Sequence, residues 1–301
     1  MGSGTFDPGS YARYTSSTSG KTRDEVFSSR SINKNLDPKG VKIRESRDSK
    51  DNPRSTPIII ALDVTGSMGQ LAEVIARKGL GVLFEEILSR KPITDPHIMF
   101  MAIGDAACDS CPLQVSQFEA DNRIVEQLTQ IYLEGGGGGN LTESYDFPWY
   151  FGAFHTEHDS LIKRGKRGYL FTIGDEESPA GLTKEQIKEF IGDDVQSNMT
   201  PEELLAEVQR KYDVFHIIIA EGSHARAFKT EVRDSWNKLI GQHAIWLDDH
   251  NKLAETIVSA IEVVEGRDAE EATKKFGESV YKAVKGLPRS RSPRLAIKNA
   301  K

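Results

Sequence analysis

The sequence has few cysteines, no long hydrophobic run and no excess of positive charge. Its two cysteines among 301 residues cannot build the disulfide framework that is typical of small secreted domains. No run of about 18 apolar residues is present, so we expect no membrane-spanning helix, and Met1–Gly4 lacks the apolar core of a secretory signal. The net charge of -6 provides no basic surface for a nucleic acid. These features predict a cytoplasmic protein, or a component of a particle assembled there, with neither a membrane nor a nucleic acid as partner.

A continuous apolar run at residues 57–62 is followed by three polar residues at alternate positions, Asp63, Thr65 and Ser67. Because the run shows no polar alternation, it predicts a strand that is buried on both faces, as in a parallel sheet. Apolar residues then recur at helical spacing over 71–88, which predicts a helix. The three polar residues therefore lie in a strand-to-helix turn, where open α/β sheets bind their ligands.

The side chains of Asp63, Thr65 and Ser67 supply one carboxylate and two hydroxyls, which are hard oxygen ligands. Such ligands suit Mg²⁺, or Mn²⁺ or Ca²⁺, and the turn has no thiolate or imidazole for zinc. The alternative is that Asp63 or Ser67 caps the helix, which accounts for only one of the three oxygens.

The segment Asp63-Val64-Thr65-Gly66-Ser67-Met68 resembles the first motif of the metal-ion-dependent adhesion site of von Willebrand factor A (VWA) domains, Asp-x-Ser/Thr-x-Ser. The resemblance covers residues 55–266. It implies a Rossmann-like α/β fold, and it implies two further loops that bring a threonine and an aspartate to the same metal ion.

The second of these loops is expected at the five consecutive glycines, 135–139. Consecutive glycines are entropically costly, so they suggest a close backbone approach or positive φ angles. By the resemblance, Thr142 is the best match for the second-loop ligand, with Asn140 and Glu143 as substitutes. A flexible linker is the alternative. The loop lacks the Gly-Lys-Ser/Thr ending of a phosphate-binding loop.

The third loop is expected after the apolar segment 169–173, which runs into Gly174, Asp175 and Glu176. The family usually has Thr-Asp-Gly at this point, so the match is one of chemistry and not of spacing. Asp175 is the expected ligand and Glu176 the alternate. An acidic helix start with no metal is the other interpretation.

Apolar segments and amphipathic segments alternate along the rest of the chain. Strands are predicted at 97–103, 168–173, 214–220 and 243–247, and helices at 123–133, 143–154, 184–191, 201–211, 225–240 and 252–265. This alternation predicts an α/β fold with a doubly wound, mostly parallel sheet flanked by helices.

Three regions are predicted from composition. Residues 1–54 are polar and read as an extended or disordered arm, residues 55–266 as the VWA domain, and residues 267–301 as a terminal helix and a basic tail. Alternatively, the arm becomes ordered on another subunit, with the following residues as anchors: Tyr11, Tyr14, Phe27, Val41 and Ile43.

The cysteines lie in Cys108-Asp109-Ser110-Cys111. A zinc site would need His155 and His158 as the second pair, and their spacing is shorter than usual; a dithiol switch would need a helix directly after the motif. Two ordinary thiols in a loop are the favoured interpretation. Asp105 and Asp109 follow a predicted strand and are expected near Asp63, as acceptors for metal-bound water.

The favoured function is a metal-dependent protein–protein interaction module that is not an enzyme. The chain would leave the coordination of the cation incomplete, and a carboxylate of a protein partner would complete it. An alternative is a structural protein that forms a homo-oligomer or a larger assembly. The polar leader and the glycine loop also resemble those of uncharacterised VWA proteins of bacteria and their tailed phages, which would place the protein in a virion.

A further alternative is a magnesium-dependent phosphohydrolase. Asp63-Val64-Thr65-Gly66 resembles the aspartyl-phosphate motif of haloacid-dehalogenase-like phosphatases, in which the first aspartate attacks phosphorus. That chemistry needs a positioned lysine, and the sequence does not distinguish among Lys163, Lys166 and Lys184.

Overall fold

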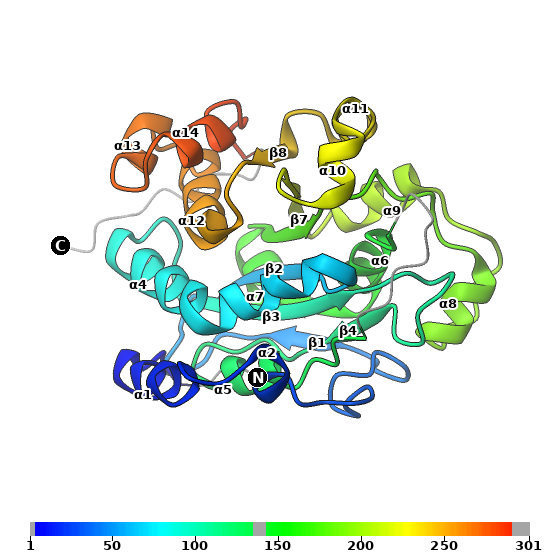
Figure 1. Cartoon of the computed structure of the whole chain (residues 1–301), viewed down its shortest axis with the longest axis horizontal. Helices are drawn as coiled ribbons and strands as arrows, with labels where there is room; N and C mark the ends of the chain where they lie inside the picture. The colour runs from blue at the N-terminus through cyan, green and yellow to red at the C-terminus, as the bar shows by residue number, and fades with distance from the viewer. Residues whose placement is uncertain (1–3, 135–142, 291–301) are drawn as a thin grey trace.

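The computed structural model describes residues 4–134 and 143–290 and shows a twisted sheet between two layers of helices (Figure 1). The sheet has six strands in the order β4-β3-β2-β6-β7-β8, and all neighbours are parallel except β4, which is antiparallel to β3. The strands are β2 Thr56–Asp63, β3 Pro96–Ile103, β4 Leu113–Val115, β6 Gly168–Gly174, β7 Tyr212–Ile219 and β8 Ala244–Leu247. The predicted α/β fold with a doubly wound, mostly parallel sheet is confirmed.

Helices cover both faces of the sheet because the central strands are apolar on both sides. In β2, Ile58, Ile60 and Leu62 face one core, while Ile59 and Ala61 face the other. Residues of the following helices reach the first core: α3 Gln70–Val74, the π-helix η2 Ile75–Gly79, α4 Leu80–Arg90, α5 Arg123–Thr129 and α12 Leu253–Val264. The second core lies under α6 Asp146–Phe154, α8 Lys184–Phe190, α9 Pro201–Val208, α10 Ser223–Ala227 and α11 Lys229–Ile240.

Short elements connect these layers. The strands β1 Arg44–Ser46 and β5 Thr156–His158 pair in parallel in a sheet of their own. The 3-10 segments are η1 Gly66–Gly69, η3 Gly241–His243 and η4 His250–Lys252, and the helix α7 Asp159–Arg164 follows β5. The helix predicted at 225–240 is divided into α10 and α11, which meet at Phe228.

Residues 4–54 differ from the extended or disordered arm that their composition predicts. They form α1 Pro8–Thr18, α2 Arg23–Val26 and β1, and Tyr11 and Phe27 are buried in the first core. The Phe6 ring stacks on Phe84 of α4 with a centroid distance of 4.3 Å. The apolar residues of this segment are few and recur with neither a helical nor a strand period, so the composition does not reveal that the segment folds. Two of the anchors proposed for another subunit, Tyr11 and Phe27, pack instead on the core of their own chain.

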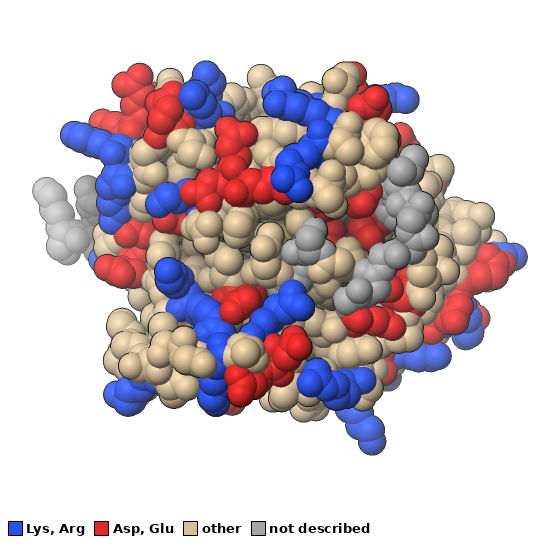
Figure 2. All heavy atoms as spheres, in the orientation of Figure 1, with Lys and Arg blue, Asp and Glu red and all other residues tan. Residues whose placement is uncertain are grey.

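The C-terminal region also packs on the first core. The predicted terminal helix is two helices, α13 Ala269–Thr273 and α14 Glu278–Val284, and Leu287 is buried beyond them. The described helices contain none that is long and apolar enough to cross a membrane. Over the described part of the face in Figure 2, Lys and Arg side chains are interspersed with Asp and Glu.

Candidate functional site

The site lies where the strand order reverses. From β2 the chain continues to β3 on one side, and it later returns to β6 on the other side of β2. Asp63 is the last residue of β2, Asp175 follows β6, and Asp105 follows β3. Because parallel strands end at one edge of the sheet, all three carboxylates lie at the same edge, which is where open α/β sheets bind ligands.

Asp63 is completely buried and is held by neutral hydrogen-bond donors. Its Oδ1 accepts from the backbone N of Thr65 at 2.9 Å and from Thr65 Oγ1 at 2.7 Å, and its Oδ2 accepts from the Tyr145 hydroxyl at 3.0 Å. Burial raises the pKa of Asp63 above its ordinary value, and the charge of Asp175 raises it further. These bonds form a turn at the strand end and do not reach the N–H groups of the first helical turn, so capping does not account for Asp63.

Tyr145 reaches Asp63 because Gly174 leaves room for its ring. A Cβ atom on Gly174 would lie 2.0 Å from the Tyr145 hydroxyl oxygen. The Tyr145 ring also meets His216 edge-on, with a centroid distance of 4.9 Å. Sequence reasoning missed Tyr145, since it lies among the aromatic residues at the start of α6 and has no distinguishing signal.

Glu143 is the first residue after the undescribed loop and is only 7% exposed. Its pKa is raised to about 9, mainly by burial, with the charges of Asp63 and Asp105 adding to the effect and the Thr65 hydroxyl opposing it. The Oε2 atom of Glu143 is buried without a hydrogen-bond partner. In the prediction, Glu143 appeared only as a substitute for Thr142, which lies outside the described residues.

Asp175 and Glu176, which follow β6, are the remaining acidic residues near Asp63. Asp175 Oδ2 accepts from the backbone N of His224 at 3.0 Å, and a Cβ on Gly222 would lie 2.2 Å from the same oxygen. Burial raises the pKa of Asp175, and burial together with the charges of Asp175 and Asp63 raises that of Glu176 to about 8. The Nδ1 atom of His224 is 3.1 Å from Glu176 Oε2.

The two cysteines, Cys108 and Cys111, are free thiols in the loop after Asp105. The Cys108 Sγ donates to Asp105 Oδ2 at 2.7 Å, and this bond is the main reason why the pKa of Cys108 is raised to about 11. Burial raises the pKa of Cys111. Since a thiol is reactive and binds metal as the thiolate, the raised values favour two ordinary thiols.

The histidines of the zinc interpretation are held elsewhere. His155 is 2.7 Å from Asp193 Oδ2 through Nε2, and His158 accepts from the backbone N of Leu161 at 3.2 Å. Asp109 was expected to accept a hydrogen bond from metal-bound water. In the structure its Oδ2 accepts from the backbone N of Asp105 at 2.8 Å, and this bond orients Asp105.

Thr65 is hydrogen-bonded to Asp63, and the charge of Asp175 acts on Asp63, so these three residues lie near one another; that they hold one cation stays a prediction. The side chain of Ser67 and all of Thr142 lie outside the described part. Among the described residues, no lysine or arginine forms an ion pair with any carboxylate of the acidic cluster, which we define as Asp63, Asp105, Glu143, Asp175 and Glu176. Glu176 has His224 as a basic neighbour, but Asp63, Asp105, Glu143 and Asp175 are buried without an ion pair among the described residues. Such buried acids are costly unless protons or a cation neutralise them. The donor set, carboxylates and a hydroxyl, fits a hard divalent cation.

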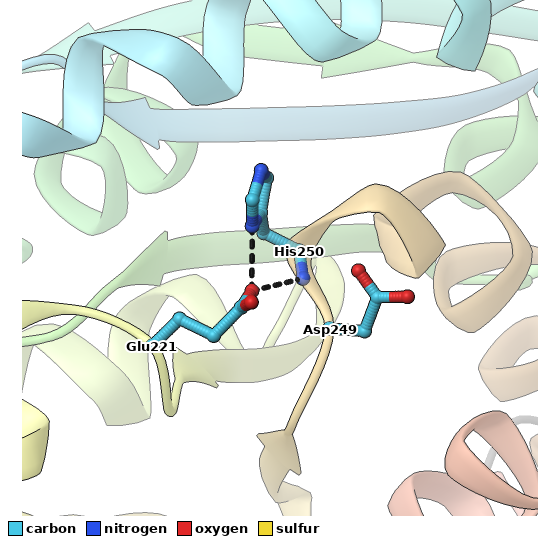
Figure 3. Close-up of side chains that lie close together, drawn as sticks. All are labelled: Glu221, Asp249 and His250. Carbon is cyan, nitrogen blue, oxygen red and sulfur yellow. Dashed lines mark hydrogen bonds and ion pairs between the residues drawn. The ribbon is translucent and has the colours of Figure 1, made fainter.

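A second group of potential ligands lies at the ends of β7 and β8 (Figure 3). One potential ligand atom from each of Glu221, Asp249 and His250 lies within 4.8 Å of the other two. Glu221 Oε2 accepts from the backbone N of His250 at 2.8 Å and lies 2.5 Å from its Nδ1, while Asp249 Oδ1 accepts from the backbone N of Asn251 at 3.0 Å. These bonds account for the group as an ion pair and a cap that close the loop after β8.

Comparison with known proteins shows similarity at the level of folds. No protein-family model and no curated protein matches the chain. Among solved structures, proximal thread matrix protein 1 from the mussel byssus matches with 10% identity and a TM-score of 0.43 over 73% of this chain and 48% of that chain. The pilus adhesin SpaC of Lactobacillus rhamnosus GG, in its open conformation, matches with 11% identity and a TM-score of 0.42 over 77% and 31%.

The solved structures also include a von Willebrand factor A protein. This protein, from Catenulispora acidiphila, matches with 14% identity and a TM-score of 0.35, over 69% of this chain and 42% of that chain. The chain spans less than half the length of each of these three solved chains.

Proposed function

We propose that this chain is a divalent-cation-dependent protein–protein interaction module. The observation that carries the proposal is the buried acidic cluster at the ends of β2 and β6, which no lysine or arginine of the described residues neutralises. The resemblance of the turn at Asp63, Thr65 and Ser67 to the adhesion site supports the same reading.

Asp63, Thr65, Ser67 and Asp175 would hold the cation, Mg²⁺ or else Mn²⁺ or Ca²⁺, and Thr142 would join them by the resemblance. When bound, the ion supplies a positive centre to which an anionic ligand can coordinate. The chain's own part is to hold the oxygens: Tyr145 and Thr65 fix both oxygens of Asp63, and the N–H of His224 fixes one oxygen of Asp175.

The partner of this module would be a protein that presents a carboxylate. Within an acidic cluster, a free carboxylate is repelled until the cation is in place, so binding of the partner would depend strictly on the ion. This dependence would make the interaction reversible by chelation.

A structural or assembly role, in the cytoplasm or in a virion, is compatible with the same site. The phosphohydrolase is less favoured because its candidate lysines are engaged elsewhere. Lys163 is 2.7 Å from Asp159, Lys166 is 2.9 Å from Glu265, and Lys184 is 3.8 Å from Glu185.

Isothermal titration of the chelator-stripped chain with Mg²⁺ and then Mn²⁺ tests the proposal. We expect saturable binding that Asp63→Asn abolishes, because the carboxylate carries the charge, while the fold is retained in circular dichroism. Asp175→Ala and Thr142→Ala should weaken binding less. The control is Asp234→Asn, which alters an exposed acid of α11. Equal ion affinity in the parent and in Asp63→Asn, or no binding by the parent, would refute the metal site.

A further inference from the structure

We infer that Glu143 is itself a ligand of the cation and holds, from within the chain, the coordination position that a partner's carboxylate must take. The inference rests on the proposed function. It makes the resting site self-ligated, so that binding of a partner is an exchange of one carboxylate for another.

The backbone around Glu143 is fixed to the end of β3. The N of Ser144 donates to Gly104 O at 3.2 Å, and Ser144 Oγ accepts from the N of Ala106 at 3.0 Å. The N of Tyr145 donates to Glu143 O at 2.9 Å, and the Tyr145 side chain binds Asp63. Glu143 is therefore anchored through the two residues that follow it, next to the turn that carries Asp63 and Thr65.

The carboxylates of the site differ in how far their oxygens are already engaged. Both oxygens of Asp63 accept hydrogen bonds, and Asp175 Oδ2 is taken by the N of His224. Glu143 Oε2 and Glu176 Oε2, by contrast, are buried without a hydrogen-bond partner, but Glu176 Oε2 lies 3.1 Å from the Nδ1 atom of His224, whereas Glu143 Oε2 has no such basic neighbour among the described residues. A buried charged oxygen without a partner is among the costliest groups in a protein, so Glu143 has the largest gain from a cation.

The surroundings of Glu143 identify the ligand that this oxygen would take. The groups that act on it electrostatically include the carboxylates of Asp63, Asp105 and Asp109 and the hydroxyl of Thr65, which are all oxygen groups. A small hard cation is the species that accepts several such oxygens at once. Glu143 then adds a negative charge to the inner shell, as a partner's carboxylate would, and the two compete for the ion.

Mn²⁺ provides the test, because its bound waters can be counted through the relaxation of water protons. In Glu143→Ala we expect a weakening of Mn²⁺ binding by roughly tenfold or more, together with a higher relaxation rate per bound ion, because water replaces the missing ligand. Acetate should then lower that rate in Glu143→Ala, whereas it should have little effect on the parent. The control is Asp234→Asn, which alters an exposed acid of α11 outside the acidic cluster.

The outcomes separate this inference from the proposed function. If Asp63→Asn abolishes Mn²⁺ binding while Glu143→Ala retains the parent's affinity and relaxation rate, the site exists and Glu143 is not a ligand. If Asp63→Asn binds as the parent does, the proposed function fails. Glu143→Gln guards against misfolding: the amide keeps the size of the side chain and cannot carry a buried negative charge, so the metal-free variant should melt at or above the parent's temperature.

Discussion

Gly174 shows how much one missing side chain contributes at the residue scale. It is the last residue of β6. Where any other residue would have its Cβ atom, the Tyr145 hydroxyl that binds Asp63 is located. The glycine thus connects the strand on one side of β2 with the carboxylate at the end of β2. Any larger residue must displace the tyrosine or the strand.

We therefore predict that Gly174→Ala lowers the free energy of unfolding by about 1–3 kcal/mol, the usual range for overpacking a core. Urea denaturation followed by circular dichroism measures this change. Gly286→Ala is the matched control, since a Cβ there meets no atom within 4 Å, and it should leave stability nearly unchanged. Equal stability of the two variants would mean that Tyr145 has room to move and does not depend on Gly174.

At the scale of elements, α1 packs against the helical segment made of α3, η2 and α4. The π-helical turn η2 interrupts the regular hydrogen-bond pattern, which leaves carbonyl groups in need of partners. The Tyr11 hydroxyl donates to Ala76 O at 3.0 Å, and Thr15 Oγ1 donates to Arg77 O at 3.3 Å. The N-terminal helix thus provides donors to two carbonyl groups of the helical segment that follows the turn at Asp63.

This arrangement predicts opposite results for two tyrosines of α1. Tyr11→Phe should lower the free energy of unfolding by about 1 kcal/mol, because Ala76 O loses its donor. Tyr14→Phe should have no effect or a slightly stabilising one, because the Tyr14 hydroxyl is buried without a hydrogen-bond partner among the described residues. Equilibrium denaturation of both variants decides this, and a larger loss for Tyr14→Phe would contradict the assignment.

At the scale of the whole molecule, the N-terminal segment, the sheet and the C-terminal helices share one core. Phe6, Leu36 and Leu287 belong to the same buried cluster as Ile60 of β2. A core that draws on both ends of the chain is expected to unfold as one unit.

Calorimetry should accordingly show one unfolding transition for the full chain, with equal calorimetric and van't Hoff enthalpies. Removal of residues 1–54 should lower the melting temperature sharply, because Phe84 and its neighbours lose their cover. A truncated chain that melts like the parent would restore the view of residues 1–54 as an independent arm.

The acidic cluster is expected to make stability depend on pH and, through the proposed cation, on metal. The folded pKa values of Asp63, Glu143 and Glu176 are raised above their ordinary values near 4, and the highest of them, that of Glu143, is about 9. Between these two limits the folded state binds more protons than the unfolded state. The free energy of unfolding of the metal-free chain should therefore fall as the pH rises through this window. Mg²⁺ should restore it, and more at pH 8 than at pH 5, because the ion binds the charged carboxylates.

Melting curves at several pH values, with and without Mg²⁺, measure this dependence. Asp234→Asn, at an exposed acid of α11, should follow the parent, and Glu143→Gln should show a weaker dependence on pH. A melting temperature that rises with pH in the absence of metal would show that the cluster is neutralised in some other way.

Local patterns predicted most of the architecture. The apolar run that became β2 and the helical spacing after it are properties of neighbouring residues, so strands, helices and the turn at Asp63 followed without tertiary information. The antiparallel edge strand β4 and the pair β1–β5 were missed because segments of three residues have too little periodicity.

The sequence by itself determined the α/β alternation and the position of the carboxylate and hydroxyls in one strand-to-helix turn, since both depend on residues close together in the chain. Only the tertiary structure decided that Tyr145 and Glu143 meet that turn, that His224 meets Asp175, and that residues 4–54 pack on the core. Such contacts depend on the order of strands in the sheet and on which scattered aromatic groups find a cavity. Both follow from packing over the whole chain, and neither leaves a period in the sequence.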